Sequence, residues 1–181
     1  VQINSGDTLS KNVISASQVL EVYGYLEDDL FAAARNITIG GVITDDAIMA
    51  AETITLNGSV EDMTLAVGDS IRINGEIQGD LFIAGNQIIL THDAVIRGNV
   101  VIAGNEILVE NGLIEGWCRI YGNDVTLGGT VRRYVELYTN EINFTEGYTP
   151  LGATTIITYR DLDAKSLPNA PQNLTIIVEE Q

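Results

Sequence analysis

Residues 71–88 read Ile-Arg-Ile-Asn-Gly-Glu-Ile-Gln-Gly-Asp-Leu-Phe-Ile-Ala-Gly-Asn-Gln-Ile, and they contain one complete unit of the repeat from which most of this chain is built. Apolar and polar residues alternate, which is the period-two pattern of a β-strand. The alternation is interrupted at Asn74-Gly75, Gly79-Asp80 and Gly85-Asn86, and such pairs are typical of turns. The same phrase starts again at Ile88, so the unit predicts one coil of a repetitive β structure.

Four columns of apolar residues recur along the chain in one common register. The first column advances in steps of 17, 17, 17, 17, 19, 18 and 17 residues, through Leu20, Ile37, Ile54, Ile71, Ile88, Ile107, Val125 and Ile142. The other three are Val22, Ile39, Leu56, Ile73, Leu90, Val109, Leu127 and Phe144; Leu26, Ile43, Val60, Ile77, Ile96, Ile114 and Val131; and Ala32, Met49, Ala66, Ile83, Ile102, Ile120 and Leu137. A fixed period of this length is the signature of a solenoid, because one unit buries its apolar side only against its neighbours.

This pattern predicts an all-β fold, a single-stranded parallel β-helix with three short strands per coil. A repeat of 17 residues gives about eight to nine coils, which stack at roughly 4.8 Å per coil. One corner carries Asp69, Asn86, Asn105, Asn123 and Asn140 in equivalent places. Because Gly and Asn tolerate a positive φ, we expect this corner to be left-handed.

The chain is expected to form one domain with three parts. Residues 1–19 resemble an imperfect first coil that caps the end, residues 20–145 form the regular β-helix, and residues 146–181 form an irregular last coil and a tail or linker. Extra residues near His92 and near Asn111 should bulge from a corner. Within the tail, residues 154–159 and 174–178 are the segments that can form further strands.

The composition of the chain excludes several classes of partner. The formal net charge is -16, with 9 Lys and Arg against 25 Asp and Glu, which argues against nucleic acid and against anionic lipid as partners. No apolar run approaches the length that spans a bilayer, so we expect no direct membrane insertion of this segment. Cys118 is the only cysteine; it has no disulfide partner within the chain, and it falls on an inward position of the core.

Aspartates gather at one corner of successive coils. Repulsion between like charges stacked along a sheet would be relieved by a bound cation, whereas a solvated acidic corner is the other interpretation. The candidate metal ligands are Asp28, Asp29, Asp45, Asp46, Asp62 and Asp80.

An apolar stripe is expected on the outside. If Leu81 and Ile83 point inward, then Phe82 points outward, together with its equivalents in neighbouring coils. The apolar stripe consists of Phe31, Ile48, Leu65, Phe82 and Val101, and it ends at Arg119 and Glu136. Exposed apolar patches of this kind mark interaction sites, and the alternatives are contact with another chain or cover by residues 174–178.

His92 and a group of tyrosines are two further candidate sites. His92 lies in the longest insertion, where a general base of an acyltransferase would be placed, or it is a solvent-exposed loop residue. Tyr121, Tyr134 and Tyr138 lie near one edge and are the candidates for carbohydrate binding. We predict no catalytic residue and no cofactor.

The phrase from Asn74 to Asn86 resembles the bactofilins, the polymer-forming cytoskeletal proteins of bacteria. Looser copies of it occur at Gly41–Ala51, Gly58–Gly68, Ile96–Asn105 and Gly129–Asn140. The resemblance implies a right-handed β-helix with three faces, which forms filaments through its coil ends without nucleotide and without catalysis. The leader at residues 5–9 is similar to bactofilin-like modules outside the cytoplasm, so an extracytoplasmic or membrane-associated location is favoured over a cytoplasmic one.

We therefore predict a non-enzymatic structural or scaffolding module that acts by self-association, as an oligomer or filament, or by docking on another protein domain. The alternative is a β-helix that binds carbohydrate or a cell surface.

Overall fold

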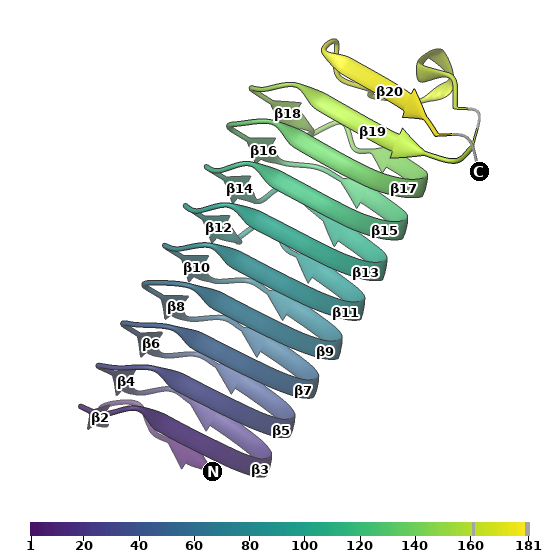
Figure 1. The fold of residues 1–181 in the computed structure, drawn as a ribbon. Helices are drawn as coiled ribbons and strands as arrows, with labels where there is room; N and C mark the ends of the chain where they lie inside the picture. The colour runs from purple at the N-terminus through teal and green to yellow at the C-terminus, as the bar shows by residue number, and fades with distance from the viewer. Residues whose placement is uncertain (161, 180–181) are drawn as a thin grey trace.

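The computed structural model describes residues 1–160 and 162–179. It is a parallel β-solenoid of about ten coils, and the coils follow one another from the N-terminal to the C-terminal end of a long stack (Figure 1). The predicted all-β solenoid with a repeat of about 17 residues is thus confirmed. The number of coils is larger than expected, because the tail adds two more strands to the stack.

Each regular coil contributes one long and one short strand. The long strands are β3 (Val13–Val22), β5 (Leu30–Ile39), β7 (Ala47–Leu56), β9 (Thr64–Ile73), β11 (Leu81–Leu90), β13 (Val100–Val109), β15 (Cys118–Leu127) and β17 (Val135–Phe144). The short strands are β2 (Thr8–Leu9), β4 (Tyr25–Leu26), β6 (Val42–Ile43), β8 (Ser59–Val60), β10 (Glu76–Ile77), β12 (Val95–Ile96), β14 (Leu113–Ile114), β16 (Thr130–Val131) and β18 (Thr149–Pro150). The stack is completed by β1 (Gln2–Ile3), β19 (Thr154–Thr158), β20 (Leu174–Val178) and the 3-10 helix η1 (Ala164–Ser166).

These strands form two parallel sheets. One has 11 strands in the order β1-β3-β5-β7-β9-β11-β13-β15-β17-β19-β20, and the other has 9, from β18 to β2. Three strands per coil were expected, but two of them run together as one long strand. In β9, for example, Thr64 and Ala66 point inward before a bend, and Ile71 and Ile73 point inward after it. Because every coil bends at the same place, the interstrand pairing continues on both sides of that corner.

The four predicted apolar columns form the core. All their members are buried except Ile142, which is partly buried. Its exposure follows from the end of the stack, because β19 pairs with β17 only as far as Tyr138 opposite Ile157. A fifth inward column, which includes Leu81 and Cys118, closes the core.

Glycine at the corner before most short strands, from β4 to β10 and again at β14 and β16, permits close stacking of the coils. A Cβ on Gly58 would collide with the carbonyl oxygen of Gly41, and a Cβ on Gly75 would collide with that of Gly58. Coils lengthened by a turn at His92–Asp93 instead have a side chain at this place, namely the buried Ala94. The glycine is therefore needed where the backbones of neighbouring coils approach closely, in the 17-residue coils and also at Gly112 of the 18-residue coil.

The corner column of Asp69 and the four asparagines is not left-handed as predicted. Among the described residues, Asn169 is the only non-glycine with a positive φ, and Gly6 and Gly129 are the only such glycines. Amide groups instead bond from coil to coil: Asn123 Nδ2 donates to Asn105 Oδ1 at 2.9 Å, and Asn140 Nδ2 donates to Asn123 Oδ1 at 3.3 Å. Polar side chains that stack in register form such ladders without requiring an unusual backbone.

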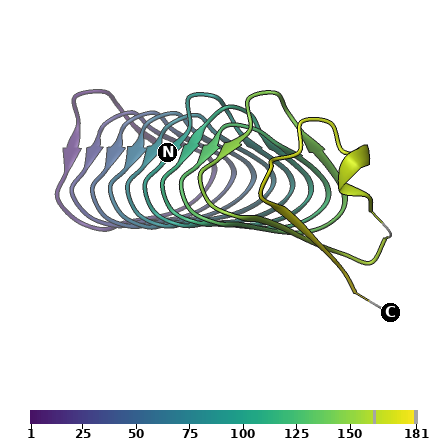
Figure 2. The same cartoon turned by 90° about the horizontal axis from the view of Figure 1, so that it is seen from above.

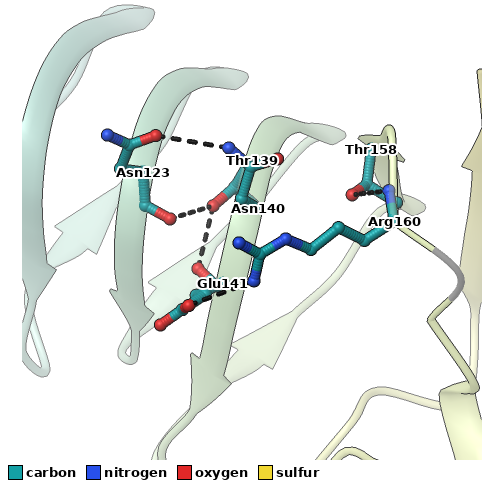
Figure 3. Close-up of polar contacts among 6 residues, drawn as sticks. All are labelled: Asn123, Thr139, Asn140, Glu141, Thr158 and Arg160. Atoms are coloured by element: carbon teal, nitrogen blue, oxygen red, sulfur yellow. Dashed lines mark hydrogen bonds and ion pairs between the residues drawn. The ribbon is translucent and has the colours of Figure 1, made fainter. Parts of the chain in front are cut away.

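In β17, Thr139 occupies the bend position at which β9, β11, β13 and β15 have glycine. Thr139 pairs with Gly122, and its hydroxyl donates to Glu141 O at 2.8 Å or to Asn123 O at 3.2 Å (Figure 3). On the surface beside it, Arg160 Nη1 donates to Glu141 Oε1 at 3.2 Å. The buried threonine is thus satisfied by backbone carbonyls, as a buried hydroxyl requires.

The tail covers part of the C-terminal end of the stack. β20 pairs in parallel with β19 along its whole length, and Asn169 Nδ2 donates to Phe144 O at 3.0 Å. Partly buried Leu162 and Leu167 pack against the core. Seen from above, the coils share one outline and the C-terminal segment departs from it (Figure 2).

Candidate functional site

The five residues of the apolar stripe lie in register on adjacent long strands. Phe31 pairs with Ile48, Ile48 with Leu65, Leu65 with Phe82, and Phe82 with Val101. Phe31 is 36% exposed and Phe82 is 37% exposed, while the other three are half-buried. Because β20 continues the stack beyond β19, residues 174–178 extend the C-terminal end and do not cover this stripe.

Sequence reasoning missed half of this surface. Ile14 extends the stripe by one coil and is 82% exposed. A second outward column runs beside the stripe, two residues further along each strand, through Ala16, Ala33, Ala50, Val67, Ala84 and Ala103. The signals were present, since Ile14 is one period before Phe31 and strand alternation places the second column outward. We call the two columns together, from β3 to β13, the apolar face.

An ion pair and aromatic side chains follow the apolar face in β15 and β17. Arg119 Nη2 lies 2.6 Å from Glu136 Oε2. Tyr121 stacks on Tyr138 with ring centroids 4.6 Å apart. These are the same two outward columns, so the surface changes from apolar to polar and aromatic along one continuous sheet.

The candidate metal ligands divide into two groups with different surroundings. One group accepts backbone hydrogen bonds from the next coil: Asp29 Oδ1 from Asp46 N at 3.2 Å, Asp46 Oδ1 from Met63 N at 3.1 Å, and Asp80 Oδ1 from Asn99 N at 2.7 Å. These carboxylates satisfy corner amides that the strand ladders leave free. Their first role is therefore structural.

The second group, Asp28, Asp45 and Asp62, completes two clusters, and Asp45 and Asp62 are exposed. Carboxylate oxygens of Asp28, Asp29 and Asp45 lie within 4.8 Å of one another, as do those of Asp45, Asp46 and Asp62. Partial desolvation and the negative charges of Asp29, Asp46, Asp62 and Asp28 raise the pKa of Asp45. Asp80 lies outside both clusters, because its neighbour is Gly79 and not a second acid. The geometry would suit a hard cation held by oxygen ligands, and it equally suits a hydrated acidic corner.

His92 lies on the exposed turn that its position in the insertion predicted. Its Nε2 lies 3.3 Å from Asp93 Oδ2 and its Nδ1 lies 3.6 Å from Glu110 Oε2. A hollow of about 450 Å³ adjoins it. Of the described residues that line this hollow, only Thr145 carries a hydroxyl, and that oxygen is buried. Both ring nitrogens thus lie near carboxylates, and the arrangement places no accessible nucleophile beside the ring.

The tyrosines proposed for carbohydrate binding form two stacked pairs. Besides Tyr121 on Tyr138, Tyr134 stacks on Trp117 at 5.9 Å between centroids. Stacking covers one face of each ring, and Tyr121 and Tyr134 remain 40% exposed. A hollow of about 260 Å³ lies beside the first pair and is also lined by Tyr159.

Two buried groups have no part in a surface site. Cys118 is fully buried, and burial raises the pKa of its thiol to about 12, so this thiol remains protonated and shielded. Burial likewise raises the pKa of Tyr148, whose hydroxyl lies 2.8 Å from Thr154 Oγ1.

In the part of the chain that the structure describes, no helix has the length and apolar character needed to cross a membrane. Comparison with protein-family models, with curated proteins and with solved structures found no match.

Proposed function

We propose that this chain is a non-enzymatic structural module that acts through contacts of its apolar face, either with copies of itself or with another protein domain. The observation that carries the proposal is the composition of that face. Neither of its two columns contains a charged residue from β3 to β13, although the chain has a net charge of -16. Contiguous apolar surface on an otherwise acidic protein favours burial against a partner.

The rigid repeat suits a scaffold. Long strands pair in register over the whole stack, so outward side chains repeat at the coil spacing of roughly 4.8 Å. Extended surfaces of this kind are how solenoids bind partners. β1 and β20 are the outer strands of the larger sheet, and strand addition at such edges is the route to filaments that the bactofilin resemblance implies.

Light scattering across a concentration series tests the role of the apolar face. The particle mass of the wild-type chain should rise with concentration, and Phe82→Asp should suppress the rise. Ile89→Asp is the matched control, because Ile89 is a half-buried outward residue of the same strand β11 on the other side of the bend.

A dye that fluoresces on exposed apolar surface provides the second readout, and its signal should fall in Phe82→Asp but not in Ile89→Asp. A chain that stays monomeric at high concentration, with neither scattering nor dye binding changed by Phe82→Asp, would contradict the proposed function.

Binding of carbohydrate or of a cell surface is the second candidate. The hollow beside Tyr121 and Tyr138 favours it, since Tyr159, Asn140 and Glu179 also line it and offer polar groups next to aromatic edges. A glycan-binding screen with the wild-type chain, Tyr121→Ala and Tyr138→Ala decides this case. Binding that both variants lose supports it, and absence of binding removes it.

A further inference from the structure

The two columns of the apolar face differ in size. The column that begins at Ile14 contains the large residues Phe31, Ile48, Leu65 and Phe82, and we call it the ridge. The neighbouring column contains five alanines and Val67, and we call it the groove. Outward neighbours on a strand are roughly 6.6 Å apart, so the ridge and the groove run parallel along the stack. A hollow of about 390 Å³ lies over the first four long strands of this face.

This shape is self-complementary under one particular two-fold rotation. A two-fold axis that lies in the interface, parallel to the stack, exchanges the positions of ridge and groove between two facing copies. Each ridge then enters the groove of the other copy, and equivalent coils lie opposite each other. An axis across the stack would instead place ridge on ridge and leave the groove empty, which close packing disfavours.

We propose that the occupant of the apolar face is a second copy of this chain, bound side by side and parallel, with the ridge of each copy in the groove of the other. The proposal rests on the proposed function and specifies its partner and its geometry. Charge favours this face over others: two copies with a net charge of -16 each repel at any acidic surface, whereas the apolar face brings no charged side chain into contact over β3 to β13.

The size of the face determines the strength of the association. Six long strands at roughly 4.8 Å, with two columns about 13 Å wide, give about 400 Å² on each copy. Stable interfaces bury about 800 Å² on each partner. The close contact ends before β15. There the groove position is occupied by the bulky Tyr121, which would face Arg119 of the other copy. The dimer should therefore be weak, with a dissociation constant above about 10 μM.

Sedimentation velocity of the full chain across a concentration series tests the second copy. The wild-type chain should pass from monomer to dimer with increasing concentration. Ala50→Glu places a charge in the groove and should weaken the dimer at least about tenfold. Thr55→Glu is the matched control, because it adds the same charge to the same strand β7 outside the apolar face, and it should dimerise as the wild type does. A wild-type chain that remains monomeric, or an Ala50→Glu dimer as tight as that of Thr55→Glu, overturns the proposal.

Oxidative cross-linking tests the geometry. In the proposed dimer Ile48 of one copy faces Ala50 of the other, so a mixture of Ile48→Cys and Ala50→Cys chains should form mixed disulfide dimers, and neither variant alone should do so efficiently. Wild-type chain is the background control, since its single cysteine, Cys118, is fully buried.

The parallel arrangement would be overturned by the opposite pattern of disulfides. In that pattern a mixture of Ile48→Cys and Leu65→Cys chains, both ridge variants, forms mixed dimers, and the mixture of Ile48→Cys and Ala50→Cys chains does not. That result would leave the proposed function standing, because association through the apolar face would still be observed. A wild-type chain that forms no dimer in sedimentation velocity would overturn the second-copy proposal. The dye assay with Phe82→Asp would then test the proposed function independently, because it does not require a second copy.

Discussion

Gly58→Ala should destabilise the solenoid, although the same substitution at an open position with an ordinary φ stabilises a protein by about 0.4–1 kcal/mol. Gly58 is not among the glycines with a positive φ, so backbone strain is not the reason. A Cβ at this place would collide with the carbonyl oxygen of Gly41 in the preceding coil. That oxygen is held in place, since it accepts the backbone hydrogen bond of Ser59 at 3.0 Å.

The magnitude follows from these two contacts. Inserting a methyl group into a closely packed site costs about 1–3 kcal/mol, and loss of the hydrogen bond from Ser59 to Gly41 adds about 1 kcal/mol. After subtraction of the gain of about 0.4–1 kcal/mol from the less flexible unfolded chain, the net loss is about 1–4 kcal/mol. For a chain of this size that corresponds to a decrease in Tm of about 2–15 °C.

Thermal unfolding followed by circular dichroism measures this decrease, with size-exclusion chromatography to show that the variant is folded. Ala94→Gly is the converse control at the equivalent corner of a longer coil. Because Ala94 is fully buried, its loss should cost about 1–2 kcal/mol. A Gly58→Ala chain as stable as the wild type, or an Ala94→Gly chain that gains stability, would refute the role of glycine in the close approach of neighbouring coils.

Three further predictions concern the acidic corner and the thiol. Asp80→Ala should lower stability by about 1 kcal/mol, because Asn99 N loses its acceptor. Asp80→Asn retains a carbonyl oxygen and should be nearly as stable as the wild type. Urea unfolding midpoints compare the two variants, and equal losses of stability would contradict a hydrogen-bonding role for Asp80. The raised pKa of Asp45 means that the folded chain holds this proton more tightly than the unfolded chain, so its favourable effect is present in acid and is lost as the pH rises through the folded pKa. Asp45→Asn should therefore raise Tm at neutral pH, and this gain should disappear at about pH 3. A gain in Tm that does not change with pH would contradict the repulsion between the aspartates. If the corner is a cation site, calcium should raise the Tm of the wild type more than that of Asp45→Asn. Cys118 should resist thiol reagents until the chain unfolds, since it is buried and burial raises the pKa of its thiol to about 12, and rapid labelling of the native chain would show that the core opens locally.

The sequence predicted the solenoid because its information is periodic. Strand alternation fixes which residues point inward, and a 17-residue period places them in columns, so the buried columns from Leu20 to Phe144 could be read directly. The direction of Phe82 and of its equivalents followed from the same alternation. Ile142 is only partly buried because its position lies near an end, which periodicity does not describe.

The candidate sites were less predictable because they depend on distances between coils. Asp28 and Asp29 look alike in sequence, yet Asp29 accepts a backbone hydrogen bond from Asp46 in the next coil, whereas Asp28 accepts one from the adjacent Asp29. Tyr134 was a candidate for carbohydrate binding, but its stacking on Trp117 occupies one face of its ring. Such contacts join residues 17 or more positions apart and are decided by the orientation of side chains across a corner.

Sequence alone therefore determined the repeat, the inward columns and the apolar stripe, since each depends on local alternation and on a constant period. Only the tertiary structure decided that two predicted strands join into one, that glycine serves close approach at Gly58, and that Asp29 and Asp46 accept amide hydrogen bonds from the next coil. The physical reason is that these features arise from the separation of neighbouring coils. That separation is set by backbone hydrogen bonds between coils and by how far each corner opens, and neither is encoded in any single coil.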